Sequence, residues 1–474
     1  MSAPEETTAL LGYGRGSQPR TASTPPLPRR SVFEEVDPLQ QQARQKSQNT
    51  SPGISTLRAV CYIVGVFGVV PIIALPGAIA YCGWIGFILA TVLVAAEVYT
   101  AVLLGKSWLM MEVFWPREAM MNRRNPYPAL AEKAGGVVLR RIVSVMQDLA
   151  LFGAAVPFTL IAAESIQELV SWLFDLNFSF CYWLIITTGL LIPLFWFGTP
   201  KDLGMVTWIG ASSVIVVSLL TIISLIQDSP ITHDPPPAFT SWTAAAYCFG
   251  AIAFQFDIHP MILTVQMDMK KKSQLPLAII IAFVVGLCLF FTISGVAFSY
   301  YGDSVKPIIL NNLARGPLLY ANMAIVALQV LMCVVLGSNA LFQDLENTLQ
   351  IPDEFGWRRI VLRTAVVLLI LFVCESVPHF GVAIELVGGL LVTPFIFVFP
   401  PIFHILIKQK ASGRIDVKDI VAAGNVITLG VLGSIAATTE SFIQLSQLKE
   451  FAPPCYINIS AASSHKDFGF PSRL

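Results

Sequence analysis

The chain has 474 residues, of which 55% are hydrophobic and 13% charged, and its formal net charge is zero. A soluble domain usually carries about 25% charged residues, so this composition argues against a soluble protein, and we expect no nucleic-acid partner. The charges avoid long apolar windows and gather between them, as they must where lipid is the solvent. The sequence therefore predicts an integral membrane protein.

The N-terminal region, residues 1–55, is rich in Ser, Thr, Pro, Gln and Arg, which predicts a disordered cytosolic tail. Glu5 and Glu6 stand where the basic segment of a signal peptide would lie, so no such peptide is expected. The run Glu6-Thr-Thr-Ala-Leu10-Leu11 fits the acidic dileucine pattern that clathrin adaptors read on cytosolic tails. It favours a lysosomal, endosomal or other vesicular membrane over the plasma membrane.

Eleven apolar windows of about 20 residues follow, each long enough to cross a bilayer as a helix. They lie at residues 58–81, 84–105, 142–169, 180–198, 203–226, 241–265, 276–301, 318–341, 359–377, 382–407 and 418–444. We therefore expect an all-α membrane protein with eleven transmembrane helices in residues 56–446 and a short C-terminal tail at 447–474. An odd number of helices places the two termini on opposite sides of the membrane.

The basic residues orient these helices. With the N-terminus in the cytosol, 25 of the 30 Lys and Arg residues fall on the cytosolic side, as the positive-inside rule requires. The sequons at Asn177 and Asn458 then face the lumen or exterior, where both are candidate glycosylation sites. Cys181 and Cys455 lie on that same side and could form a disulfide, but the sequence leaves their pairing open.

The window at 249–265 contains four residues that are unusual in a membrane, Gln255, Asp257, His259 and Pro260. An Asp at the centre of a spanning helix costs about 2.5–3.5 kcal/mol on insertion scales. Residues two apart point about 200° from each other in an unbroken helix, but Pro260 removes a backbone donor and interrupts the helix. The interruption lets Asp257 and His259 face one cavity, so the cluster predicts a site for a polar solute.

The first window carries a matching interruption, with Gly65, Gly68, Pro71 and Pro76 in residues 64–77. The two interrupted windows are five apart, and an odd offset turns the second copy upside down in the membrane. Inverted repeats whose broken helices meet near the midplane are typical of secondary transporters. We therefore expect a 5+5 inverted repeat with the eleventh helix as an addition.

Several segments resemble the amino acid/auxin permease family, a group of transporters with the LeuT-type fold. The resemblance covers about residues 55–445 and mixes features of the proton-coupled and the sodium-coupled neutral amino acid branches. It rests on Leu75–Trp84, Tyr127–Gly135, Phe254–Pro260, Met267–Lys270, Tyr300–Gly302, Ile309–Leu313 and Leu386–Pro401. The chain departs from the family at Val69-Val70-Pro71, where a Gly-x-Gly is expected, and this moves the predicted break back to Gly65–Gly68. The resemblance implies a membrane transporter of amino acids.

An amino acid presents a carboxylate and an ammonium, and the two interrupted helices suggest a place for each. Helix N-termini favour anions, so we expect the carboxylate at Gly65–Gly68 and near His259. Unwound carbonyls at Phe254–Phe256, or Asp257 itself, are suited to the ammonium. The phenylalanines are expected either to shape the pocket or to pack as ordinary core residues. The expected substrate-binding residues are Gly65, Val66, Phe67, Gly68, Phe254, Phe256, Asp257 and His259.

The driving ion follows from the available ligands. A sodium site needs several oxygen ligands, yet residues 59–82 contain no Ser, Thr, Asn, Asp or Glu, and Ser338 and Asn339 would be nearly the only side-chain help. A buried acid such as Asp257, with His259 nearby, can take a proton instead. We therefore expect proton coupling and no cofactor, with sodium-coupled or uncoupled transport and an amino acid sensor with little flux as alternatives. Neither a nucleophile–base pair nor a metal-spaced His/Cys set suggests an enzyme.

Two further acids in apolar windows are left over. Glu97 in the second window has no obvious partner in the sequence. Glu385 stands near the outer end of the tenth window, and we interpret it as a solvated helix end, with a gate as the alternative.

Overall fold

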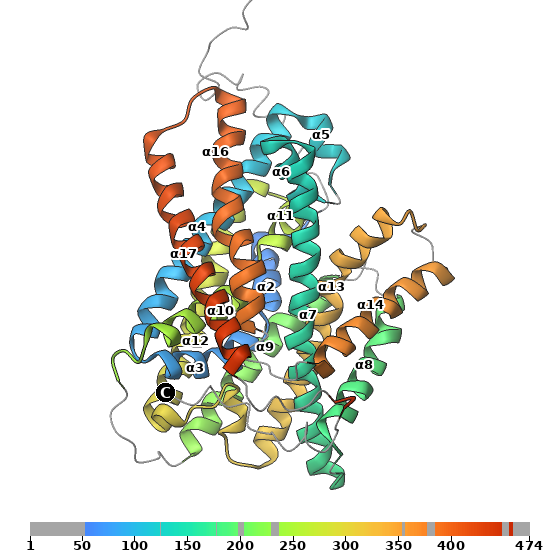
Figure 1. Cartoon of the computed structure of the whole chain (residues 1–474), viewed down its shortest axis with the longest axis vertical. Helices are drawn as coiled ribbons and strands as arrows, with labels where there is room; N and C mark the ends of the chain where they lie inside the picture. Colours follow the sequence, from blue (N-terminus) through green and yellow to red (C-terminus); the bar gives the residue numbers. More distant parts are fainter. Residues whose placement is uncertain are drawn as a thin grey trace, which may run out of the picture. The chain divides into compact units, whose positions relative to one another are not determined.

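The computed structural model describes residues 53–123, 125–176, 178–197, 203–228, 237–352, 356–376, 384–447 and 455–457. These residues form helices and their connections, apart from one isolated β-bridge between Ile54 and Met269 (Figure 1). The dileucine residues Glu6, Leu10 and Leu11 and the sequon asparagines Asn177 and Asn458 lie outside the described residues.

The helices follow one another along the whole membrane domain. In chain order they are α2 (Thr56–Phe67), α3 (Val70–Cys82), α4 (Ile85–Phe114), α5 (Pro116–Met121), α6 (Pro126–Gly135), α7 (Val137–Phe174), α8 (Phe180–Phe197), α9 (Leu203–Gln227), α10 (Trp242–Gln255), α11 (His259–Asp268), α12 (Leu275–Tyr301), α13 (Pro317–Thr348), α14 (Trp357–Ser376), the π-helical turns η5 (Val387–Val392) and η6 (Pro394–Val398), α16 (Phe399–Ser412) and α17 (Val417–Gln447). The prediction of an all-α membrane protein is confirmed.

The number of spans is less sharply defined than the fold class. Within the described residues, eight helical segments are long and apolar enough to cross a membrane, and α2 with α3 forms a ninth span bent by 53°. Two of the eleven windows remain. The fourth contains α8, an apolar helix shorter than the spans above, and the ninth contains α14, which does not qualify as a span by length and composition. Each of the eleven windows contains a described helix, but the count of eleven spans stays a prediction.

The helices of both interrupted spans are enclosed by others. α2 packs against α9 and α12, α10 packs against α3 and α17, and α7 runs along α13 (Figure 1). Large apolar side chains such as Ile88 on α4, Val284 on α12 and Leu432 on α17 remain more than half exposed. Apolar outer faces of this kind are stable in lipid and not in water.

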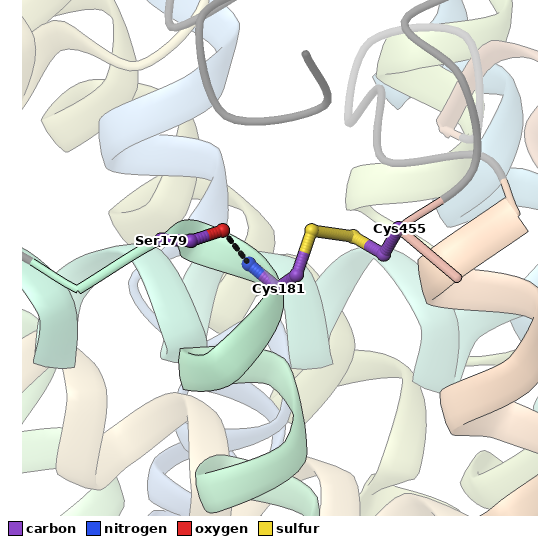
Figure 2. The surroundings of a disulfide bond; sticks show 3 residues. All are labelled: Ser179, Cys181 and Cys455. Carbon is purple, nitrogen blue, oxygen red and sulfur yellow. Dashed lines mark hydrogen bonds between the residues drawn. A yellow bond between two sulfur atoms is a disulfide. The ribbon is translucent and has the colours of Figure 1, made fainter. Parts of the chain in front are cut away.

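A disulfide joins Cys181, at the start of α8, to Cys455 (Figure 2). The two residues are 274 positions apart in the sequence, and their sulfur atoms are 2.06 Å apart. Ser179 Oγ accepts a hydrogen bond from the Cys181 backbone N–H at 3.3 Å, and Cys455 N–H donates to the carbonyl of Glu375 at 3.1 Å. The structure therefore pairs the two cysteines whose bonding the sequence left open.

Candidate functional site

The first span is interrupted between α2 and α3. Gly68 ends α2 with a φ of 66° and donates its backbone N–H to Val64 O at 3.2 Å. This left-handed conformation is one that glycine adopts without steric cost. Pro71 then stands in the first turn of α3, where its missing N–H does no harm. The break lies at Gly68 and Val69, at the end of the segment from which it was predicted.

The sixth span is interrupted between α10 and α11. Phe256, Asp257 and Ile258 separate the two helices, and Pro260 occupies the first turn of α11. The carboxylate of Asp257 accepts the backbone N–H of His259 at 3.0 Å, so it satisfies one of the donors that a helix start leaves without a partner. The predicted interruption is present, and the Asp257 carboxylate also stabilises the start of α11.

A cavity opens where the two interruptions face α7, α9 and α13. Five of the residues expected to bind substrate line it, namely Gly65, Val66, Phe67, Phe254 and Asp257. The remaining lining residues are Tyr62, Ala150, Leu151, Ala154, Phe158, Thr207, Gly210, Gln255, Pro260, Met261, Gln329, Met332, Cys333, Gly337 and Val392. The contributions of α7 and α13 were not predicted residue by residue.

Three expected substrate-binding residues do not line the cavity. A Cβ atom on Gly68 would lie 2.9 Å from Gln329 Oε1, so this position allows a close approach of α13. Phe256 is fully buried and packs its ring edge-on against Phe67, with a centroid distance of 5.4 Å. His259 is also fully buried.

His259 connects the sixth span to α4. Its Nε2 lies 3.0 Å from Thr100 Oγ1, and its Nδ1 lies 3.4 Å from Asp257 Oδ1 without the geometry of a hydrogen bond. Thr100 Oγ1 also lies 3.0 Å from the carbonyl oxygen of Glu97. The imidazole therefore stands between a helix hydroxyl and the carboxylate that reaches the cavity.

The side chain of Gln329 on α13 forms hydrogen bonds with the backbone on both sides of the break in the first span. Its Nε2 donates to Gly65 O at 3.1 Å, and its Oε1 accepts the Val69 N–H at 3.4 Å. Backbone groups freed by a break in the membrane must find partners within the protein, and one side-chain amide supplies both a donor and an acceptor. A polar amide near the centre of the eighth apolar window was the signal that could have identified this residue.

Two acids that the sequence left without a role are buried. Glu97 on α4 is 0% exposed, and neither of its carboxyl oxygens has a hydrogen-bond partner within the described residues. Glu385, two residues before η5, is also 0% exposed and lies beside Glu440 and Ser441 of α17. The interpretation of Glu385 as a solvated helix end is therefore wrong, because α17 covers it.

Known proteins are similar to this chain in sequence and in fold. Amino acid transporter AVT1C of Arabidopsis thaliana is 22% identical over 421 residues, covering 85% of this chain and 71% of AVT1C. Amino acid transporter AVT1I of the same plant is 21% identical over 415 residues, covering 84% of this chain and 98% of AVT1I. Among solved structures, MhsT in complex with L-phenylalanine aligns with a TM-score of 0.55 at 12% identity and covers 83% of this chain and 100% of MhsT.

This structural likeness confirms the LeuT-type fold. The profile of the family described as Transmembrane amino acid transporter protein matches residues 52–443, which is most of the chain. Its relatives and structural neighbours are transporters and not enzymes. The chain belongs to the amino acid/auxin permease family of transmembrane amino acid transporter proteins.

Proposed function

We propose that this protein is a proton-coupled secondary transporter of neutral amino acids, which it binds between the interrupted first and sixth spans. The observation that carries the proposal is the cavity at these breaks, where Asp257 is the only charged side chain among the described lining residues. Asp257 is 12% exposed and pairs with the substrate ammonium. The amino end of α3, which begins directly after the break at Gly68 and Val69, receives the carboxylate, because Gly65–Phe67 form the last turn of α2, where the helix dipole disfavours an anion.

The remaining walls support a neutral side chain on the substrate. Phe67, Phe158, Phe254, Met261 and Met332 make the wall largely apolar. An acidic substrate side chain would find no cation among the described lining residues, and burying an unpaired charge is costly. Phe158 and Phe254 meet edge to face with ring centroids 5.7 Å apart, and this pair bounds the space for the side chain.

Proton coupling is favoured over sodium coupling by the contacts at the two breaks. The carbonyl of Gly65, a natural cation ligand, is already bound by the Gln329 amide. When the His259 imidazole carries its proton on Nε2, its Nδ1 is a hydrogen-bond acceptor, and so is the neighbouring Asp257 Oδ1. The two atoms then attract each other only if one proton is added between them. A site whose residues attract each other only when a proton is added is suited to proton coupling.

Uptake into proteoliposomes tests the proposal. The probe is a panel of L-alanine, L-leucine, L-phenylalanine and L-glutamine, offered with acid outside, neutral buffer inside and choline in place of sodium. We expect concentrative uptake of at least one member, of about tenfold per unit of pH gradient for one proton per substrate. Strict sodium dependence would refute proton coupling. Saturable binding without flux would favour the sensor.

The disulfide and the N-terminal dileucine support a vesicular location with the N-terminus in the cytosol. Disulfides persist in oxidising compartments, which agrees with Cys181 and Cys455 on the lumenal side. A lysosomal or endosomal lumen would also supply the proton gradient. Replacing Leu10 and Leu11 with Ala is expected to move the protein to the cell surface, measured by surface biotinylation. An unchanged intracellular distribution would remove the support for adaptor-mediated sorting.

A further inference from the structure

Glu97 is a buried acid that the proposed substrate site does not use. It has 0% exposure, and both of its carboxyl oxygens lack a hydrogen-bond partner in the described part of the chain. Burying an ionised carboxylate without a partner costs several kcal/mol. A position that served only packing would be filled more stably by an apolar side chain of similar size, so Glu97 calls for a functional reason.

Glu97 lies on the side of α4 that faces the interrupted sixth span. Thr100 follows it by three residues on α4, so the two side chains project from the same side of the helix. Thr100 contacts His259 Nε2 at 3.0 Å, which turns this side of α4 toward the interrupted sixth span. His259 Nδ1 lies 3.4 Å from Asp257 Oδ1. Thr100 and His259 therefore stand between the two acids Glu97 and Asp257, of which only Asp257 lines the cavity.

Four other buried titratable side chains on elements packed against α4 have neighbours of their own. Tyr127 of α6 donates to Phe395 O at 2.8 Å, and His404 of α16 lies with its Nδ1 3.1 Å from Ser107 Oγ. The rings of Tyr81 on α3 and Tyr247 on α10 pack against each other, 5.5 Å between centroids. Asp257 and His259 are thus the titratable partners of Glu97 at the break.

We propose that Glu97 carries the transported proton while Asp257 holds the substrate ammonium. The inference rests on the proposed function and deepens it. An ionised carboxylate in the protein interior disfavours the ionisation of a second carboxylate near it. A zwitterionic amino acid adds no net charge to the site, so Asp257 can stay ionised and bind the ammonium only while Glu97 is protonated.

The protons balance over one transport cycle. In the loaded carrier Glu97 is neutral, Asp257 is ionised, and His259 is protonated on both ring nitrogens. When the cavity opens to the cytosol, Glu97 releases its proton to water, the Nδ1 proton of His259 moves to Asp257, and the ammonium leaves. Facing the lumen again, Asp257 returns that proton to His259 and Glu97 takes one from the lumen. One proton crosses with each amino acid.

The test compares Glu97→Gln with Asp257→Asn in proteoliposomes, using the panel member that the wild type transports best. Glu97→Gln keeps the shape and neutrality of the protonated acid, so we expect exchange of labelled for unlabelled substrate at equal pH to be retained. Acid-driven accumulation should fall from about tenfold per pH unit to simple equilibration. Asp257→Asn should lose both. Substrate-induced thermal stabilisation of Glu97→Gln in detergent checks that it is folded.

Glu385→Gln is the matched control, because Glu385 is equally buried but lies beside α17 and beside Gly250 of α10, seven residues before Asp257. It should keep both exchange and acid-driven accumulation. If Glu97→Gln accumulated substrate as the wild type does, Glu97 would not carry the proton, while the proposed function could still hold. If Glu385→Gln lost acid-driven accumulation to the same extent, the loss would be a general effect of removing a buried acid, and the assignment of Glu97 would also be overturned. Absence of acid-driven uptake in the wild type would instead refute proton coupling itself.

Discussion

Replacing Asp257 with Asn is expected to abolish acid-driven uptake and to weaken substrate binding by about 2–5 kcal/mol, at least about thirtyfold in Kd. The change removes the only charge among the described residues that line the cavity, so the buried substrate ammonium loses its counter-ion. Asn keeps an oxygen that can accept the His259 N–H, and the start of α11 should therefore persist. Equilibrium binding of labelled substrate to purified protein measures the effect.

The control for this variant is Asp416→Asn. Asp416 lies in the connection before α17, where it pairs with Lys408 at 2.8 Å and remains 72% exposed. Exposed ion pairs of this kind contribute little, so uptake and binding should match those of the wild type. A Kd for Asp257→Asn equal to that of the wild type would show that the ammonium binds elsewhere and that Asp257 acts only at the start of α11.

Gln329→Leu is expected to destabilise the protein by about 1–3 kcal/mol and to weaken substrate binding at the same time. The leucine leaves Gly65 O and Val69 N–H without the amide that now pairs with both. The interrupted segment of the first span would then lose the contacts that position it beside the cavity. Thermal unfolding in detergent, followed by substrate binding on the same preparation, measures both effects.

Gln266→Leu separates stability from binding. Gln266 on α11 is also fully buried, and its Nε2 donates to Gly105 O at 3.1 Å, outside the cavity lining. Its loss should lower stability to a similar extent while the substrate Kd stays unchanged. If Gln329→Leu and Gln266→Leu behaved alike in binding, the role of Gln329 at the break would be merely structural.

Much of the fold was predictable because lipid restricts a chain so strongly. Apolar windows of bilayer length must be helices, since no water is present to bind free backbone groups. A charge or a Pro inside such a window is costly, which is why Asp257 and Pro260 located the interruption of the sixth span correctly. The glycines of residues 64–77 likewise located the first interruption, with Gly68 in a left-handed conformation.

The candidate site was predictable only in part. Gly65, Val66, Phe67, Phe254 and Asp257 line the cavity, because the helix breaks that identify them also expose them. Phe256 and His259 belong to the same interrupted segment but turn into the packed interior. Within a non-helical turn the direction of each side chain depends on neighbouring helices, and the local sequence carries no period that would reveal it.

The sequence by itself determined the membrane class, the interrupted spans and the family, because these depend on local composition and on the cost of polar groups in lipid. The tertiary structure alone decided which residues from distant helices meet. Gln329 pairs with Gly65 across 264 positions, Thr100 meets His259 across 159, and Cys181 bonds Cys455 across 274. Such pairs arise from helix packing, whose geometry depends on the whole set of side chains that interlock between helices and not on any single window.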